Sequence, residues 1–444
     1  MEQPATATVT FQTPAGLLVG QRDGAVVRVR GIRYARAARF APPQPEPTAA
    51  APIVADTPAP ACPQMPDARL DAVLGDFMTT LRADEDCLRL SVTLPADRCP
   101  NEQLPVLVWV HGGSYVSGAG DLPLYDPAVL VAEQRVLFVA VTYRLGLLGW
   151  LGYPGGPPAN LGLLDLLEAL RWVQRNTPAL GGNPALVTLL GHSSGADAVA
   201  RLLLVPEARG LFRRVIMHSP PLGLARNRAR MVQAMAAAVT PLPTTGPVAE
   251  VLAREQLATQ AARRFGLRGA MPFGPQFGAA PLPPEAAADQ AWQATAPAVE
   301  VLIGTTAAET RFFAVIDPAL RWLGRVPGLG SLVVALTSWL VYKGGVRAFA
   351  RRHARAEGCA HRFVVDYRPP GSAFGAAHCI DLPLLLGTPA AWAATPLLGR
   401  ATWPEVLAAG RPLRQLWVDF ARTGQLPART TIPGVARVWR VPGA

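Results

Sequence analysis

The chain has few cysteines and almost no lysine for its 444 residues. Its five cysteines are an odd and sparse number, which excludes a small fold held together by disulfide bonds. Only 16% of the residues are charged and half are apolar, which excludes a disordered chain. The composition therefore indicates a large, well-buried globular protein, whose 45 prolines and 41 glycines imply many loops.

Positive charge comes almost entirely from arginine, since Lys343 is the single lysine among 42 basic residues. The formal net charge of +11 would suit an anionic partner. A nucleic-acid-binding protein, however, gathers its basic residues on one element, often with aromatic residues among them. The densest basic group here lies between Arg347 and Arg355, and we interpret it as the solvated face of a helix. We therefore expect no nucleic-acid partner.

No apolar segment indicates a helix that crosses a bilayer. Residues 329–342 are apolar, but a spanning helix needs about twenty such residues. We interpret this segment as a buried or cavity-lining helix, with an interfacial anchor as the alternative, and expect no stable membrane anchor. A secretory signal has a charged region followed by an apolar one, and the first residues do not show this pattern. We therefore expect a cytoplasmic protein.

One stretch carries a chemical motif. A short apolar run at residues 186–190 leads directly into Gly-His-Ser-Ser-Gly at 191–195, and a helical pattern begins at once. A Gly-x-Ser-x-Gly sequence between a strand and a helix forms a tight turn that exposes the serine at the helix N-terminus. The motif predicts Ser193 as a nucleophile. We do not expect the neighbouring His192 to be its base.

Buried strands alternate with helical segments on both sides of this motif. Residues 105–110 and 136–143 are continuous apolar runs, typical of strands that are covered on both faces. Residues 163–174 have a helical pattern, and the alternation that ends at Val92 predicts a half-exposed strand. Strands separated by helices predict an α/β fold, with a mostly parallel central sheet flanked by helices.

Two stretches after the motif read as helical excursions from the sheet. Residues 222–299 and 311–358 contain helical pieces and no clear strand, and we expect them to form a cap over the sheet. Strands at residues 299–304 and 362–367 return to the sheet, and a last helix is expected at 411–422. No repeat or linker divides the chain, so we expect a single domain from residue 1 to 444.

A serine nucleophile needs an imidazole to take its proton and a carboxylate to orient the imidazole. In α/β-hydrolases the acid and then the histidine follow the serine along the chain, each in a loop after a strand. His378 follows the strand at 362–367 and is the predicted base. Glu309 lies five residues after Gly304 and is the predicted acid, with Asp317 as the alternative.

An oxyanion that forms during acyl transfer needs backbone N–H donors that are already in position. One is expected at Ser194, the residue after the nucleophile. Others are expected in the sequence His-Gly-Gly-Ser at 111–114, which follows the strand at 105–110. Small residues are required there because the backbone itself must approach the substrate.

Taken together, these segments resemble the type-B carboxylesterase and cholinesterase-like family of α/β-hydrolases, and the resemblance covers most of the chain. Its motifs keep the family's order: Gly31-Ile-Arg-Tyr-Ala35, Glu85-Asp86-Cys87-Leu88, residues 105–120, Tyr143-Arg-Leu-Gly146, Asn160-Leu-Gly-Leu-Leu-Asp165, Gly181-Gly-Asn-Pro184, the Ser193 motif, Gly210-Leu-Phe212, Ser219, Pro272-Phe-Gly-Pro275, Glu309, His378 with Asp381, and Phe420-Ala-Arg-Thr-Gly424.

The resemblance implies a serine carboxylic-ester hydrolase that works through an acyl-enzyme and needs no metal or other cofactor. The site that it implies consists of Ser193 as nucleophile, Glu309 as acid, His378 as base, the oxyanion donors Gly113, Ser114 and Ser194, and Gly112 and Ser219 in supporting positions.

The chain also departs from the family's pattern. The family has Glu-Ser-Ala where this chain has His192, Ser193 and Ser194, and Cys379 stands where a small residue usually follows the base. Cys62 and Cys87 match a pair that family members in oxidising compartments bridge. Because the expected compartment is reducing, a disulfide between them is left open.

We expect the partner to be a small to medium carboxylic ester, and the acyl chain length and the oligomeric state stay open. One alternative is a catalytically inactive, cholinesterase-like binding module, but the presence of all three triad residues favours an enzyme. Another is a lipase or an amidase that uses the same triad.

Overall fold

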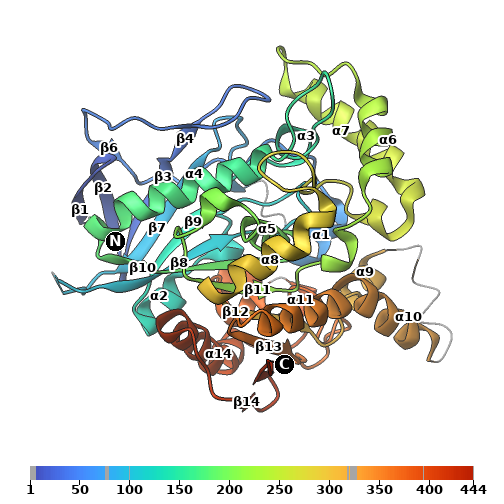
Figure 1. Cartoon of the computed structure of the whole chain (residues 1–444). Helices are drawn as coiled ribbons and strands as arrows, with labels where there is room; N and C mark the ends of the chain where they lie inside the picture. Colours follow the sequence, from blue (N-terminus) through green and yellow to red (C-terminus); the bar gives the residue numbers. More distant parts are fainter. Residues whose placement is uncertain are drawn as a thin grey trace.

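One large sheet runs through the computed structural model, which describes residues 7–75, 80–99, 101–317, 320, 328–393 and 395–443 (Figure 1). Its strands are, in spatial order, β1 (Thr8–Thr13), β2 (Gly16–Asp23), β3 (Val26–Arg33), β7 (Arg89–Pro95), β9 (Leu137–Val141), β8 (Leu104–Val110), β10 (Gly182–His192), β11 (Arg214–His218), β12 (Glu300–Thr306), β13 (Ala360–Val365), β15 (Ala436–Arg440) and β14 (Arg429–Ile432), with β6 (Ile53–Val54) beside β2. A separate pair is formed by β4 (Ala35–Arg36) and β5 (Gln44–Pro45).

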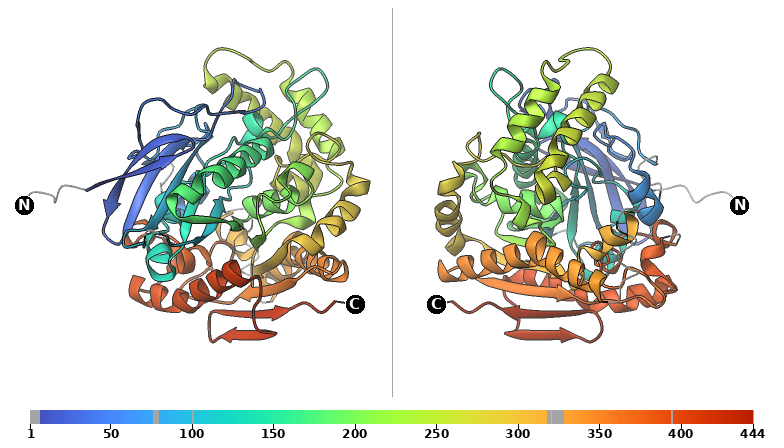
Figure 2. Two further views of the ribbon diagram at one scale, coloured as in Figure 1. Left: turned by 60° about the vertical axis from the view of Figure 1, so that its left-hand side comes forward. Right: turned by 90° about the vertical axis from the view of Figure 1, so that its right-hand side faces the viewer.

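The centre of the sheet is parallel, as the sequence predicted. The strands from β9 to β13 in the spatial order all run in one direction, whereas β1, β2, β3 and β7 form an antiparallel meander. At the other edge, β15 and β14 form an antiparallel hairpin, which Figure 2 shows along one side of the molecule. Parallel strands require crossover connections, and helices supply them here.

The helices are α1 (Ala68–Leu74), α2 (Ala128–Gln134), α3 (Gly146–Gly149), α4 (Leu161–Asn176), α5 (Ser194–Leu202), α6 (Ala229–Val239), α7 (Val248–Ala262), α8 (Ala288–Thr295), α9 (Arg311–Ile316), α10 (Leu329–Ser338), α11 (Gly344–Arg355), α12 (Leu382–Leu385), α13 (Pro389–Trp392) and α14 (Trp403–Thr423). Helices α4, α5 and α11 cover one face of the sheet, and α2 and α14 cover the other.

Two apolar cores therefore sandwich the sheet. Along β8, the side chains of Val106 and Val108 belong to the core beneath α4 and α5, whereas Leu107 and Trp109 belong to the core beneath α14. Every residue of β8 is buried. This burial on both faces explains the continuous apolar runs in the sequence, because a strand that is covered on both faces has no polar side.

Two sequence predictions about local structure were wrong, and one element was not predicted. Strand β7 is almost fully buried instead of half-exposed. The polar Ser91 in its middle can be buried because its hydroxyl donates a hydrogen bond to the carboxylate of Asp121. The last helix begins at Trp403 and not at residue 411, since Thr402 and Glu405 form a capping box. The hairpin of β14 and β15 was not foreseen.

The two excursions have the expected helical character in the part of the chain that the structure describes. Residues 222–299 contain α6, α7 and α8, and the described part of 311–358 contains α9, α10 and α11; neither holds a strand. Residues 318–319 and 321–327, which belong to the second excursion, lie outside the described residues. In Figure 1, α6 and α7 stand on one side of α5, and α9 and α10 project on the other.

The apolar segment at 329–342 is not a helix of its own. α10 continues through a π-helical segment, η10 (Trp339–Lys343), into α11, which makes one helix of 27 residues, Leu329–Arg355. By length and composition alone, this helix could cross a membrane. Its C-terminal half is packed in the fold, where Val346, Phe349 and Ala350 are buried. Its N-terminal half lines a cavity with Val333, Val334 and Thr337, as expected of a buried or cavity-lining helix, but its other side is exposed.

A buried ion pair connects the start of α4 to the end of β9. Asp165 is fully buried and accepts hydrogen bonds from the backbone N–H of Arg144 and from two of its guanidinium nitrogens, at 2.6–3.1 Å. The remaining Nη1 of Arg144 donates to the carbonyl of Ala41 at 2.7 Å. Removing the carboxylate would leave a charged guanidinium buried without its counter-ion.

We expect Asp165→Ala to lower the free energy of unfolding by about 3–5 kcal/mol, measured by urea denaturation. The matched control is Arg368→Ala, which breaks the exposed ion pair with Asp366. Such surface pairs contribute less than about 1 kcal/mol. Equal effects of the two substitutions would contradict the structural role of the buried pair.

Candidate active site

Ser193 sits in a turn whose backbone is strained. β10 ends at His192 and α5 begins at Ser194, which leaves Ser193 with φ of 54° and ψ of −123°. A residue with a side chain in this region costs about 1–3 kcal/mol. A side chain at either flanking glycine would clash with the backbone. A Cβ on Gly195 would lie 2.1 Å from the carbonyl oxygen of Val110, and one on Gly191 would lie 2.7 Å from the Cα of Ala196.

The three predicted triad residues lie in one hydrogen-bonded chain. The Oγ of Ser193 is 2.9 Å from Nε2 of His378, and Nδ1 of His378 is 2.6 Å from Oε2 of Glu309. All three side chains are buried, with Glu309 fully inaccessible. The structure pairs Glu309, and not the alternative Asp317, with the imidazole. Such a chain can pass the serine proton to Nε2 while the carboxylate holds the ring.

Glu309 is itself held in place by two donors. Its Oε1 accepts a hydrogen bond from the backbone N–H of Thr306 at 2.7 Å and from the hydroxyl of Ser219 at 2.6 Å. Oε2 is thereby left for His378. Ser219, predicted in a supporting position, lies one residue beyond β11 with a positive φ of 51°. It orients the carboxylate by this direct contact.

The glycine-rich loop approaches Ser193 closely, as predicted. A Cβ on Gly112 would lie 3.1 Å from the Cβ of Ser193 and 2.9 Å from the carbonyl oxygen of His192. Gly113 and Ser114 both have positive φ values, 116° and 55°, and line the same cavity as Ser193. Ser194 is the first residue of α5, and the first N–H groups of a helix have no partner within it. The three residues predicted as donors therefore lie near Ser193, two on the cavity wall and one next to it in the chain.

A cavity of about 1210 Å³ opens above Ser193. Both excursions contribute its walls, together with α1 and the glycine-rich loop. The larger apolar side chains that line it are those of Met65, Leu70, Val116, Leu224, Leu267, Met271, Phe313, Ile316, Leu320, Val333, Val334, Val341 and Tyr342. The rings of Phe313 and Tyr342 also lie 5.9 and 5.2 Å from the ring of His378, so the second excursion shields the base.

Comparisons with known proteins agree on the family. A sequence model of the carboxylesterase family matches residues 7–321. A probable N-octanoylanthranilate hydrolase of Rhodococcus erythropolis is 37% identical over 427 residues, covering 94% of this chain and 93% of the relative. The para-nitrobenzyl esterase of Bacillus subtilis (strain 168) is 30% identical over 456 residues, covering 93% and 89%.

The chain belongs to the carboxylesterase family.

Solved structures support the same assignment. A thermophilic para-nitrobenzyl esterase superposes with a TM-score of 0.78 at 26% identity, covering 94% of this chain and 92% of that one. The carboxylesterase of Geobacillus stearothermophilus gives 0.72 at 26% identity, with the same coverage. The fold is therefore the predicted α/β-hydrolase fold, and the protein is a carboxylic-ester hydrolase.

A second buried network lies beside the triad of this carboxylesterase, and the sequence did not reveal it. Asp381 accepts a hydrogen bond from Nδ1 of His218 at 2.5 Å, and its other oxygen is 3.5 Å from Nε2 of His192. The indole of Trp417 donates to Nε2 of His218 at 2.6 Å. Burial alone would raise the pKa of Asp381, but His192 and His218 hold it well below its usual range.

His192 belongs to this network and not to the triad. Burial lowers the pKa of its imidazole, which outweighs the opposite effect of Asp381. Its Nε2 faces Asp381, whereas the serine hydroxyl is bonded to His378. The geometry therefore assigns His192 to a place beside the site, as expected for a residue that is not the base.

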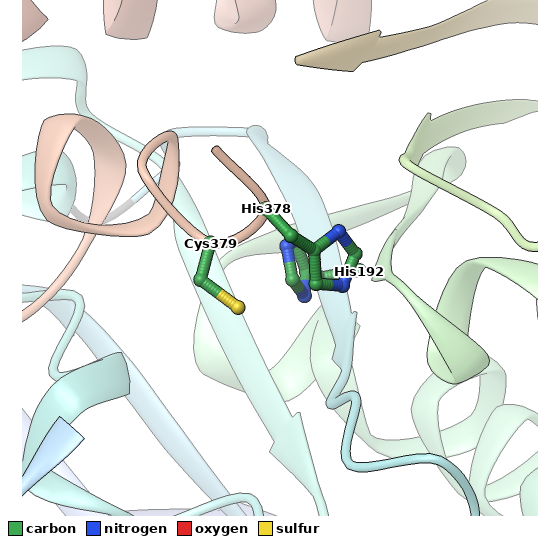
Figure 3. A group of neighbouring side chains, drawn as sticks. All are labelled: His192, His378 and Cys379. Atoms are coloured by element: carbon green, nitrogen blue, oxygen red, sulfur yellow. The ribbon is translucent and has the colours of Figure 1, made fainter. Parts of the chain in front are cut away.

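Cys379 brings a thiol close to both histidines. Figure 3 shows its side chain beside the overlapping rings of His192 and His378, and one ligand atom from each of the three lies within 4.8 Å of the others. Both ring nitrogens of His378 are already bonded, to Glu309 and Ser193. A metal ion could use this imidazole only by breaking the triad, so the group does not fit a metal that assists catalysis.

The pair of cysteines that matches the family's bridged pair is present but unbridged. Cys62 and Cys87 are both buried, and each is a free thiol. The hydrogen bond to Cys62, together with burial, raises the pKa of Cys87 well above its usual range. The disulfide that the sequence left open is therefore absent from this structure.

A lone carboxyl group lines the cavity on the side of the first excursion. Glu255, on α7, is buried and accepts a hydrogen bond from the backbone N–H of Leu147 at 2.9 Å. Gly146 leaves room for it, since a Cβ there would lie 1.8 Å from the carboxylate. Burial raises the pKa of Glu255 from its ordinary 4.5 to about 7.

This raised pKa predicts a pH-dependent stability. Between pH 4.5 and 7 the folded protein keeps a proton on Glu255 that the unfolded chain has released, so stability falls as pH rises through this window. Glu255→Gln cannot ionise and keeps an acceptor for Leu147. We expect its free energy of unfolding, relative to the wild type, to rise by about 3 kcal/mol from pH 4 to pH 8.

The measurement is urea denaturation of both proteins across that pH range. Only the difference between them matters, because all other titrating groups are shared. A difference that is constant with pH would mean that Glu255 is ionised in the folded protein like an ordinary carboxylate.

Proposed function

We propose that Ser193, His378 and Glu309 act as the nucleophile, base and orienting acid of this hydrolase. The observation that carries the proposal is the hydrogen-bonded chain from the serine hydroxyl through the imidazole to the buried carboxylate. Because Nε2 faces Ser193 at 2.9 Å, it can take the hydroxyl proton as the oxygen attacks an ester carbonyl.

The remaining steps follow from the same contacts. The carbonyl oxygen, now negative, is stabilised by the N–H groups of Gly113, Ser114 and Ser194. His378 then gives its proton to the departing alcohol, which leaves an acyl group on Ser193. A water molecule that is activated by His378 hydrolyses this acyl-enzyme and regenerates the serine. Glu309 holds the ring of His378 through its hydrogen bond to Nδ1 in both halves of the reaction.

A fluorophosphonate probe tests the nucleophile. It is expected to label the wild type at Ser193, and Ser193→Ala is expected to lose the label and at least about 10³-fold of kcat for p-nitrophenyl butyrate. The matched control is Ser194→Ala, in the same turn: it keeps the backbone N–H and is expected to retain label and activity. Labelling at another residue, or none on the folded wild type, would overturn the proposal.

We further propose that the acyl group is of medium length and that the leaving group is aromatic. The cavity exceeds the usual 300–1,000 Å³ of small-molecule sites and is walled mostly by apolar side chains, so it has room for an acyl chain and a ring together. A relative that covers nearly the whole chain is named for an N-octanoyl anthranilate substrate. That name also favours a second activity, cleavage of the corresponding aryl amides.

A chain-length series tests this substrate class. We expect kcat/KM of p-nitrophenyl esters to rise from acetate to a maximum near octanoate, and octanoyl anilide to be cleaved more slowly by the same serine. Val334→Trp would place a large ring in the cavity wall, so we expect it to lower octanoate turnover while sparing acetate. Rates that fall steadily from acetate onward would contradict a medium-chain site.

A further inference from the structure

The helix Leu329–Arg355 exposes large apolar side chains on its outer side. The exposed fractions are 65% for Leu332, 55% for Leu336, 47% for Trp339 and 49% for Leu340. These residues follow one another at the i, i+4, i+7 and i+8 positions, so they share one side of the helix. We call these four residues the outer apolar face. Apolar residues gathered in this way on a surface mark an interaction site, unlike single exposed ones.

The opposite side of the same helix belongs to the cavity above Ser193. Val333, Val334, Thr337, Val341 and Tyr342 line that cavity. The hydroxyl of Thr310, the residue after Glu309, also bonds to Thr337 and Ser338 at 2.7 and 2.9 Å. This single helix therefore forms the cavity wall here, with the cavity on one side and the outside of the protein on the other.

The cavity's border continues the apolar character of this helix. Met65 and Leu267 line the cavity and are at the same time 37% and 46% exposed. Figure 1 shows α10 projecting at the edge of the molecule, beyond α9 and on the same side as α1. Whatever covers the outer apolar face would therefore lie close to the entrance of the cavity.

Positive charge flanks these apolar side chains. Arg347, Arg351 and Arg355 are exposed and stand four residues apart on the same long helix. Arg263 and Arg264 are exposed and shortly precede Leu267. The chain as a whole carries a formal charge of +11. A second copy of this chain would bring like charges against this surface, whereas an anionic lipid surface would match it.

We propose that the outer apolar face docks on an anionic lipid surface, with the entrance of the Ser193 cavity turned toward the lipid. An apolar stripe with a tryptophan at its edge and arginines beside it is the pattern of a helix that lies in the lipid interface. The helix does not span the bilayer, because α11 is packed against the sheet. Docking is peripheral and reversible, and it does not depend on the proposed substrate class.

Vesicle co-sedimentation tests the proposal with the full chain. The wild type is expected to bind vesicles that contain about 30% phosphatidylglycerol at least about tenfold more strongly than pure phosphatidylcholine vesicles, and high salt is expected to weaken this binding. Leu336→Gln combined with Leu340→Gln is expected to reduce binding at least about tenfold. Arg347→Glu combined with Arg351→Glu is expected to do the same, since each arginine near an anionic surface contributes about fivefold.

The matched control is Val54→Gln. Val54 is 67% exposed, and Figure 1 shows its strand β6 on the side of the molecule away from α10. This variant is expected to bind like the wild type. None of the substituted residues lines the cavity, so kcat/KM for the soluble p-nitrophenyl butyrate is expected to change less than about twofold in every variant, which also shows that each is folded.

Three results would overturn the proposal. The first is a wild type that binds vesicles with phosphatidylglycerol no more strongly than vesicles without it. The second is double variants that bind vesicles as well as the wild type. The third is a wild-type dimer in analytical ultracentrifugation that the leucine substitutions split, because the outer apolar face would then be an interface between copies. None of these results bears on Ser193 labelling, so the proposed triad would stand or fall separately.

Discussion

The site depends on the parallel pairing of five adjacent strands. In the order β8, β10, β11, β12 and β13, the carboxyl ends of these strands meet at one edge of the sheet. His192, His218 and Gly304 are paired in one row of the ladder, and the N–H groups of Ser193 and Ser219 donate to the carbonyls of His218 and Gly304. The ladder thus fixes the position of the nucleophile relative to the residue that holds Glu309.

The network around Asp381 gives this edge a fixed charge. An indole nitrogen can only donate, so Nε2 of His218, which accepts from Trp417, carries no proton. The other ring nitrogen of His218, Nδ1, is the one that faces Asp381 at 2.5 Å. The carboxylate stays ionised beneath the site, close to His192, whose ring lies 4.9 Å from that of His378. The fixed negative charge of Asp381 therefore belongs to the surroundings of His192.

The sequence was sufficient where the structure is local or follows the order of the chain. The turn at Ser193 could be predicted because two glycines, a strand and a helix are contiguous, and Glu309 and His378 because the loops after successive strands reach one edge. The pairing of Asp381 with His218 joins residues 163 positions apart, and no local pattern signals it. The helix Leu329–Arg355 was divided in two, because its apolar and basic halves meet at Gly344 and Gly345 and look like separate elements.

The chemistry and the choice of substrate come from different parts of this carboxylesterase. The sheet edge supplies the reacting groups, whereas much of the cavity wall is formed by the two excursions, which can change without altering the strand ends. Hydrogen bonds nevertheless tie each excursion to the ends of the strands. Glu255 accepts from Leu147, shortly after β9, and Lys343 donates to the carbonyl of Ala307, in the loop that carries Glu309. A shift of the second excursion would therefore act, through the bond of Lys343, on the loop that carries Glu309, whereas a shift of the first would act on α3.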